Sequence, residues 1–353
     1  MNKKILSLAI LTAAWSAQLN AQQDRHFSMW NEQPSAINAG ATAVMDEDIR
    51  FVTNFRMQWL TMTGEAFRTN SFGVDAKLFK NGNNHLGIGV NFINDATGDM
   101  RLTSNIVSVP INYTLEADKN LLFSIGVAPG FFQQSIKNSN MTWNNQWNGL
   151  NYDISQNSGE GFSPDNAVSS FDIGAGLNMK YNFDSYSFLN IGLSVNHITA
   201  PQVNYSTGMV NNLYRNVNIM ASGTKFYDDR NFGISPQVLL QFMGPSRNIL
   251  FGTYFDHEMF ESSKRTDYVQ RSFISYGVFA RLNDALIASM AYKFNGIKIG
   301  ASYEFNLSKL SEATRTVGGF ELFLKYSTMT DRKAYIHDRK LFRWNRNRGG
   351  KRM

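Results

Sequence analysis

The feature that most constrains this chain is an alternation of apolar and polar residues that recurs along most of its length. In residues 107–115 the odd-numbered positions are apolar and the even-numbered ones are mostly polar. Residues 86–92, 171–181 and 189–195 alternate in the same way. A period of two residues is that of a β-strand with one apolar face, whereas helical periodicity is hard to find in this sequence. The chain is therefore predicted to be all-β.

Two all-β architectures produce this alternation: a soluble β-sandwich, whose apolar face is the core, and an outer-membrane β-barrel, whose apolar face meets lipid. Three observations favour the barrel. The alternating segments are about 9 to 11 residues long, which suffices to cross a bilayer when they are tilted. Their polar faces are rich in Gly, Ser and Asn rather than in Lys and Glu. Aromatic residues lie near segment ends, as in the girdles of such barrels: Phe79, Phe131, Tyr181, Phe255 and Tyr326.

The chain divides into four predicted parts. Residues 1–21 form a signal peptide that is cleaved, since a basic start and an apolar stretch lead to the small residue Ala21. Residues 22–48 are an N-terminal segment that lies in the periplasm or in the barrel lumen, which it could plug. Residues 49–328 form a transmembrane barrel of about 12–14 antiparallel strands. Residues 329–353 form a basic C-terminal tail in the periplasm.

The strand count is open within this range. About 14 candidate strands alternate with turns and loops, and an even number returns both ends of the barrel to the periplasm. Residues 243–247 are short where a long outer loop is expected, and residues 256–270 are long where a short turn is expected. A miscounted strand in this region would lower the number.

Residues that carry chemistry are sparse. The chain has no cysteine, and no two of its five histidines have the spacing of metal ligands on a helix. It also lacks the G-x-S-x-G motif of a hydrolase nucleophile. Residues 95–99 carry two aspartates that fit a turn better than a calcium loop, because the full ligand pattern is missing. A non-enzymatic protein without cofactor or metal is predicted.

The largest predicted outer loop, residues 134–166, carries three large aromatic residues, Trp143, Trp147 and Tyr152, among many Asn, Ser and Gly. Exposed tryptophans are frequent anchors of binding surfaces, so these residues are candidates for binding a client protein. The alternative is a loop that packs on itself as a lid over the barrel mouth.

Several motifs in order resemble the PorP/SprF family of outer-membrane proteins, associated with type IX secretion. Residues 54–59, N-F-R-M-Q-W, are similar to a family strand through Asn54, Arg56, Gln58 and Trp59. His197 and Pro201 are similar to the family's exit from a later strand, and residues 318–326 resemble its closing strand. Residues 38–40 match the family's N-P-A-x-A-G-like stretch in part, because its usual proline is missing.

The resemblance implies a function and its partners. Family members are non-enzymatic barrels that help large secreted proteins, including gliding adhesins, to reach or remain on the cell surface. They often serve one client, whose C-terminal domain marks it for export. The expected partners are therefore this client, components of the secretion or gliding machinery in the periplasm, and outer-membrane lipid.

The tail carries the basic character of the chain. Residues 331–353 contain nine Lys or Arg and two Asp, which is +7 against +6 for the whole chain. Nucleic acid is not an expected partner, because an even strand number places the tail in the periplasm. The tail could dock on an acidic periplasmic protein, lie on anionic lipids or act as a solubilising extension. The predicted docking residues are Arg332, Arg339, Lys340, Phe342, Arg343, Trp344, Arg346 and Arg348.

Two other functions use the same fold, since fold alone does not decide function. An outer-membrane porin or solute transporter would need an open or gated lumen. A structural surface anchor would need no machinery at all.

Overall fold

The computed structural model describes residues 24–59, 66–98, 102–135, 142–157, 159, 167–184, 187–203, 211–227, 231–262, 269–308, 314 and 316–330. The predicted signal peptide and the basic tail, residues 331–353, lie outside the described residues.

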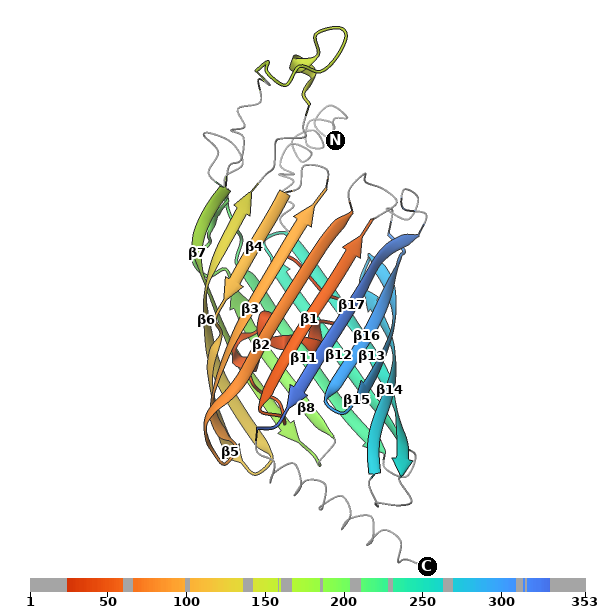
Figure 1. Cartoon of the computed structure of the whole chain (residues 1–353). Helices are drawn as coiled ribbons and strands as arrows, with labels where there is room; N and C mark the ends of the chain where they lie inside the picture. Colours follow the sequence, from red (N-terminus) through yellow and green to blue (C-terminus); the bar gives the residue numbers. More distant parts are fainter. Residues whose placement is uncertain are drawn as a thin grey trace, which may run out of the picture.

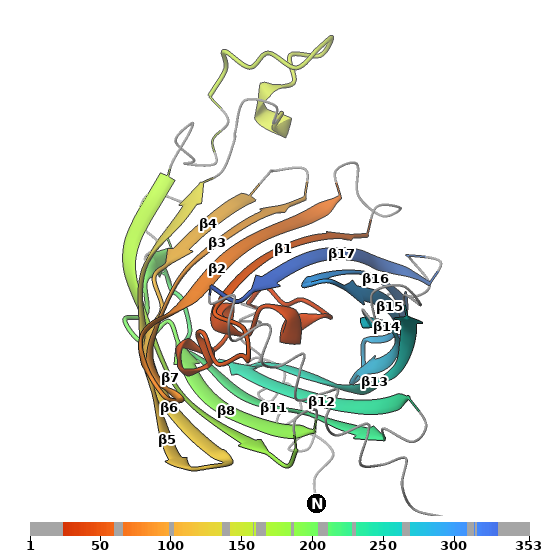
Figure 2. The ribbon, with the colours of Figure 1, turned by 60° about the horizontal axis from the view of Figure 1, so that its bottom comes forward.

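Fourteen antiparallel strands close into a single barrel, which confirms the predicted fold class at the upper end of the strand count (Figures 1 and 2). The first strand, β1, pairs with β2 on one side and with the last strand, β17, on the other, and this pairing closes the sheet. The pieces β4 and β5 are one barrel strand. They share one register against β3, with Asn91 opposite Ser108 and Ile88 opposite Ile111, and only residues 109 and 110 interrupt them.

The barrel strands are β1 (Ile49–Gln58), β2 (Phe67–Asn81), β3 (Asn84–Thr97), β4 (Leu102–Ser108) with β5 (Ile111–Asp118), β6 (Leu121–Ser135), β7 (Ala167–Asn182), β8 (Phe188–Asn196), β11 (Asn216–Tyr227), β12 (Phe232–Met243), β13 (Ser246–Ser262), β14 (Val269–Arg281), β15 (Ala285–Phe294), β16 (Ile297–Asn306) and β17 (Val317–Thr328). A short ribbon of β9 (Gln202–Val203) and β10 (Asn211–Asn212) lies between β8 and β11.

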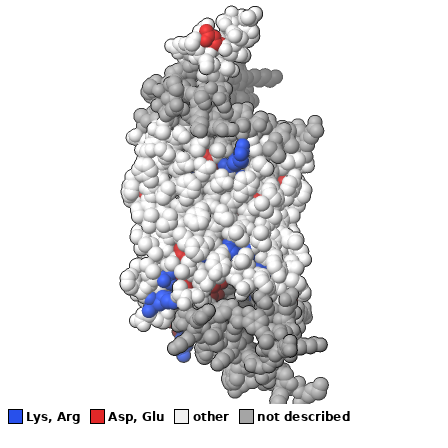
Figure 3. All heavy atoms as spheres, viewed as in Figure 1, with Lys and Arg blue, Asp and Glu red and all other residues white. Residues whose placement is uncertain are grey.

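The two faces of the wall follow the predicted alternation. Apolar side chains point outward and stay exposed, for example Ile125 at 62% and Val278 at 53%. Polar side chains such as Asn112 and Asn178 point inward and are buried. The face seen in Figure 3 is almost free of charged atoms between its two ends. An apolar exterior of this kind is what a lipid bilayer requires of a barrel.

The even strand number brings the start of β1 and the end of β17 to the same end of the barrel, here called the inner end (Figure 1). The described residues of the two longest connections, 142–157 between β6 and β7 and 197–203 with 211–215 between β8 and β11, lie at the opposite or outer end (Figure 1). The suspected miscount did not occur. A tight outer turn at Gly244, which has a φ of 54°, joins β12 to β13, and both strands are present.

The strands are longer than the sequence suggested. The expected strand length was about 9 to 11 residues, enough to cross a bilayer, but β7 has 16 residues and β13 has 17. The alternation continues past the length that a tilted strand needs to cross lipid, about 9 to 11 residues, so several hairpins extend beyond the crossing.

Residues 24–48, hereafter the lumenal segment, lie inside the barrel (Figure 2). This segment contains three short helices, η1 (Trp30–Glu32), η2 (Pro34–Ala36) and η3 (Ala39–Ala41). Asp24 contacts Asn216 at the outer end, and Asp48 contacts Thr330 at the inner end, so the segment runs through the lumen. None of the helices in the described ranges is long and apolar enough to span a membrane.

Candidate functional site: the lumenal segment and the two barrel ends

The outer end of the lumenal segment is held by an imidazole between two carboxylates. The ring of His197 lies with Nδ1 at 2.6 Å from Asp172 and with Nε2 at 3.5 Å from Asp24. Burial lowers the pKa of His197, but its hydrogen bonds to Asp172 and Asp24 outweigh burial and raise the pKa to about 9. At neutral pH the ring is therefore an imidazolium, which holds Asp24 to the wall.

A buried charge cluster on the barrel wall holds the next part of the segment, at Ser28 and Met29. Glu304 accepts hydrogen bonds from the guanidinium groups of Arg56 at 2.9 Å and Arg281 at 2.8 Å. Glu321 accepts the backbone N–H groups of Ser28 at 2.8 Å and of Met29 at 3.0 Å. The cluster therefore binds the backbone of the lumenal segment as well as its side chains.

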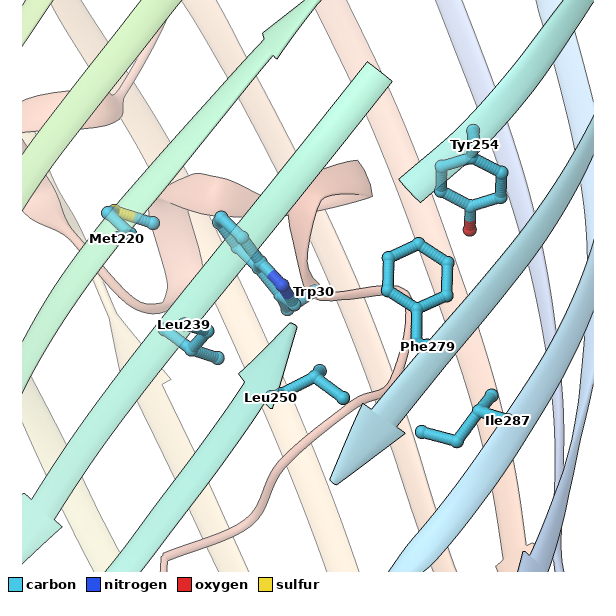
Figure 4. Packing of buried hydrophobic residues seen from close by; sticks show 7 residues of the cluster. All are labelled: Trp30, Met220, Leu239, Leu250, Tyr254, Phe279 and Ile287. Atoms are coloured by element: carbon cyan, nitrogen blue, oxygen red, sulfur yellow. The ribbon is translucent and has the colours of Figure 1, made fainter. Parts of the chain in front are cut away.

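Trp30 is the apolar anchor of the segment. Its indole is 2% exposed and packs among lumen-facing side chains of β11 to β15 (Figure 4). These are Met220, Leu239, Leu250, Tyr254, Phe279 and Ile287. This part of the wall is apolar on its inner face too, which a water-filled channel would not need.

The next residues of the segment are fixed by polar contacts. Glu32 is paired with Lys298 at 2.5 Å and also with Lys325. The amide of Gln33 accepts from Asn54 at 3.0 Å and donates to Asn91 at 3.1 Å.

Helix η3 approaches the wall at two glycines. A side chain at Gly126 would place its Cβ 2.5 Å from the carbonyl oxygen of Ala39, and one at Gly176 would meet Asn38. The oxygen of Gly40 accepts hydrogen bonds from Asn112 at 3.0 Å and Ser124 at 2.6 Å. The close packing of backbone against backbone is possible because both wall positions lack a side chain.

Three consecutive carboxylates close the inner end. Asp46 pairs with Lys180 at 2.7 Å, and Glu47 accepts from Ser327 at 2.9 Å. Asp48 pairs with Lys80 at 2.8 Å and accepts from both the N–H and the hydroxyl of Thr330. Burial raises the pKa of Asp48, but these hydrogen bonds outweigh it and lower the pKa to about 2.

Two cavities remain beside the segment. One of about 80 Å³ lies toward the outer end and is lined by Trp30, Gln33, Asn91 and His197, among others. The other, of about 190 Å³, lies at the inner end beside Asp46 and Lys293. The described residues contain no group of three or more His, Cys, Asp or Glu that could hold a metal ion. The buried ionisable groups described above all contact the lumenal segment or its neighbours, so their evident chemistry is to hold it.

The family description "Type IX secretion system membrane protein PorP/SprF" matches residues 19–326. The chain belongs to the PorP/SprF family. The match covers the lumenal segment and the barrel strands as far as Tyr326. No curated protein matches the chain.

Solved structures with a similar fold are outer-membrane barrels. The CymD monoaromatic hydrocarbon channel is 9% identical, with 86% of this chain and 94% of that one covered and a TM-score of 0.46. The Pseudomonas putida toluene transporter TodX is 10% identical over 84% and 93% of the two chains, with a TM-score of 0.43. A Pseudomonas aeruginosa FadL homologue is 11% identical over 82% and 92%, with a TM-score of 0.41. At these identities the likeness concerns the fold alone.

Three of the six PorP/SprF motif residues contact the lumenal segment or the cluster that holds it. Asn54 binds Gln33, Arg56 belongs to the buried charge cluster, and His197 holds Asp24. Gln58 lies half-buried at the end of β1, and the Trp59 ring packs edge-on against Phe67 at 4.8 Å. Pro201 is buried, and its carbonyl accepts from Leu213. The structure thus brings Asn54, Arg56 and His197 to one segment and leaves the other three apart.

The predicted loop residues lie at the outer end, away from the motif. Trp147 and Tyr152 form an isolated bridge, with ring centroids 5.0 Å apart, and are 50% and 46% exposed. Trp143 begins the short helix η5 (Asn144–Gln146) and is half-buried. The described part of the loop stands clear of the strand ends in Figures 1 and 2 and does not cover the barrel mouth as a lid would.

The eight tail residues predicted to dock a periplasmic partner lie outside the described residues. Sequence reasoning missed the wall residues that hold the lumenal segment, namely Asp172, Arg281, Lys298, Glu304, Glu321 and Lys325. The sequence did contain a signal for them. Along each strand every second residue faces the lumen, these positions are mostly Gly, Ser or Asn, and an ionisable residue among them stands out.

Proposed function

We propose that the protein is a non-enzymatic outer-membrane barrel that assists type IX secretion and holds one large client protein, such as a gliding adhesin, at the cell surface. It does so by binding the client's C-terminal domain. The observation that carries this proposal is the lumenal segment, which crosses the lumen and contacts the wall from one end to the other. A barrel whose lumen is occupied in this way has its two ends available for partners, and the family match supplies the secretion context.

The outer loop is the proposed contact with the client. Trp147 and Tyr152 present two large rings in a locally folded loop, and aromatic side chains are the commonest hot spots of protein interfaces. A rigid aromatic pair loses little conformational entropy on binding.

The test is retrieval of the client with the tagged protein from outer membranes in mild detergent. Wild-type protein should retrieve one large surface protein through its C-terminal domain. The variant Trp147→Ala with Tyr152→Ala should lose at least about 2 kcal/mol of binding, roughly thirtyfold in affinity.

The matched control is Phe183→Ala. Phe183 is exposed at the inner end of the barrel, and its ring centroid lies 5.0 Å from that of the half-buried Tyr181. Equal retrieval by both variants would refute the loop as the client site. Retrieval of machinery components alone would refute client attachment.

The basic tail is the proposed contact with periplasmic components of the secretion or gliding machinery. Removal of residues 331–353 should leave the barrel in the outer membrane and impair surface display of the client. Normal display by the truncated protein would exclude this role.

A porin or solute transporter is the second candidate function. The cavity of about 80 Å³ beside Trp30 is the one observation that favours it, because it could hold several waters or a small solute. Conductance measurements, described below, separate the two.

A further inference from the structure

The inner end of the barrel carries a polar recess that the proposed function does not use. This cavity of about 190 Å³ lies between the lumenal segment and the walls formed by β1, β7, β8, β11, β15 and β17. Its lining includes four cationic side chains, Arg50, Lys180, Lys293 and Lys325, against two carboxylates, Asp46 and Glu47.

Among the described residues, cations outnumber carboxylates around this recess. Seven cationic side chains line it or face the same carboxylates: Arg50, Lys77, Lys80, Lys180, Lys293, Lys298 and Lys325. Five carboxylates oppose them: Glu32, Asp46, Glu47, Asp48 and Asp75. Each carboxylate already has a cationic partner, so the excess charge is positive.

Among these cations, Lys293 is the one best placed to bind an incoming carboxylate. Its side chain is 44% exposed, and its nearest carboxylate, Glu47, is 4.0 Å away and also receives the hydroxyl of Ser327. Lys180, in contrast, is buried against Asp46, whose own side chain is 76% exposed and can turn aside. An incoming carboxylate could therefore pair with Lys293 and share Lys180.

The chain leaves the barrel beside this recess. Thr330, the last described residue, is bound to Asp48 through its N–H and its hydroxyl. Twenty-three residues with a charge of +7 follow from this point. In sequence, the chain therefore continues from the rim of the recess into a basic segment.

We propose that the recess and its rim form a docking surface for an acidic segment of a periplasmic protein, with a carboxylate side chain entering beside Lys293 and Lys180. The basic tail steers the acidic segment toward the recess, and the recess fixes it. This inference rests on the proposed contact of the basic tail with periplasmic components and adds the recess to that contact. It does not depend on client binding at the outer end.

The test uses the purified full-length protein in nanodiscs of phosphatidylcholine and a fluorescent deca-glutamate peptide, with deca-lysine as the control peptide. Anisotropy should show that deca-glutamate binds and deca-lysine does not. Binding should weaken as ionic strength rises to about 0.15 M, where the Debye length is about 8 Å. Lys293→Gln should weaken it severalfold, and Lys293→Gln with Lys180→Gln should weaken it further.

Lys225→Gln is the matched control, because Lys225 lies at the same end, 56% exposed, in a pair with Asp184 outside the recess. It should bind deca-glutamate as the wild type does. Equal binding by Lys293→Gln and wild type would overturn the proposal, as would binding to phosphatidylglycerol vesicles without binding to deca-glutamate. Client retrieval should be unchanged in Lys293→Gln, so this result is independent of the proposed client binding at the outer end.

Discussion

At the scale of single residues, several buried charged side chains of the barrel wall contact the lumenal segment. Arg56 and Glu304 are 2% and 1% exposed, and both sit in a cluster that binds backbone groups of Ser28 and Met29. Buried ion pairs contribute little net stability compared with apolar packing of the same shape. We take their role here to be register, since they fix which residue of the segment lies at which height.

Trp30→Ala should be the most destabilising substitution in the lumenal segment. It removes a fully packed indole and leaves a cavity among the apolar side chains of β11 to β15. The expected loss is about 3–5 kcal/mol of unfolding free energy, measured by urea denaturation in detergent micelles. Trp147→Ala, at a 50% exposed site, should change it by less than about 0.5 kcal/mol. A similar loss in both would contradict the buried role of Trp30.

His197 should make stability fall at alkaline pH. Its pKa is raised from 6.5 to about 9, so its contribution is complete below pH 6.5 and is lost as pH rises through about 9. The shift corresponds to roughly 3 kcal/mol. Urea midpoints taken on both sides of this window should differ more for wild type than for His197→Gln. Parallel curves for the two proteins would show that the Asp24 contact carries no such energy.

At the scale of elements, the strands follow from local sequence and the lumenal segment does not. In a strand of alternating residues such as 171–181, the local sequence alone indicates which side chains face lipid and which face the lumen. The contacts of the segment join residues far apart in the chain, such as Met29 and Glu321, and no local pattern encodes such a pairing. The sequence thus allowed a lumenal or a periplasmic position for residues 22–48.

Some signals were present but undervalued. Asn54, Arg56 and His197 were recognised by resemblance alone, although an arginine on the lumen-facing parity of β1 requires a buried partner on physical grounds. Which acid would meet it could not be deduced, because its partner Glu304 lies on β16, and the registers of β1 with β17 and of β17 with β16 together decide the pairing.

Gly126→Val tests the contact between η3 and the wall. The new side chain would collide with the backbone of Ala39, and backbone cannot move aside as a flexible side chain can. Overpacking should cost about 1–3 kcal/mol, visible as a lower thermal unfolding temperature. The control, Ala288→Val, adds two methyl carbons on the lipid-facing side of β15 and should be nearly neutral. Equal effects would mean that η3 is not seated against β6.

At the scale of the whole molecule, the barrel is a wall built around a core. Polar residues face inward, as in a channel, but they bind the lumenal segment from its outer end at Asp24 to its inner end at Asp48. The two ends remain as working surfaces, with an aromatic loop at one and a basic recess at the other.

Planar-bilayer recordings should show no steady conductance for the purified protein. The reason is that a fixed segment, held by ion pairs and by Trp30, occupies the path that ions would take. An open porin reconstituted in the same bilayers serves as the positive control. Stable unitary conductance would favour the porin alternative over client attachment.

The course of the lumenal segment has a topological consequence. It passes through the ring of strands like a thread, entering at the outer end and continuing at Ile49 into the ring itself. If the barrel closed first, the segment could enter the lumen only if its N-terminal side then passed through the whole lumen, because its other end continues directly into β1. The simplest order of assembly lays residues 24–48 on an open, curved sheet first. The pairing of β1 with β17 then comes last and seals the thread inside, which makes this seam the point at which assembly is completed.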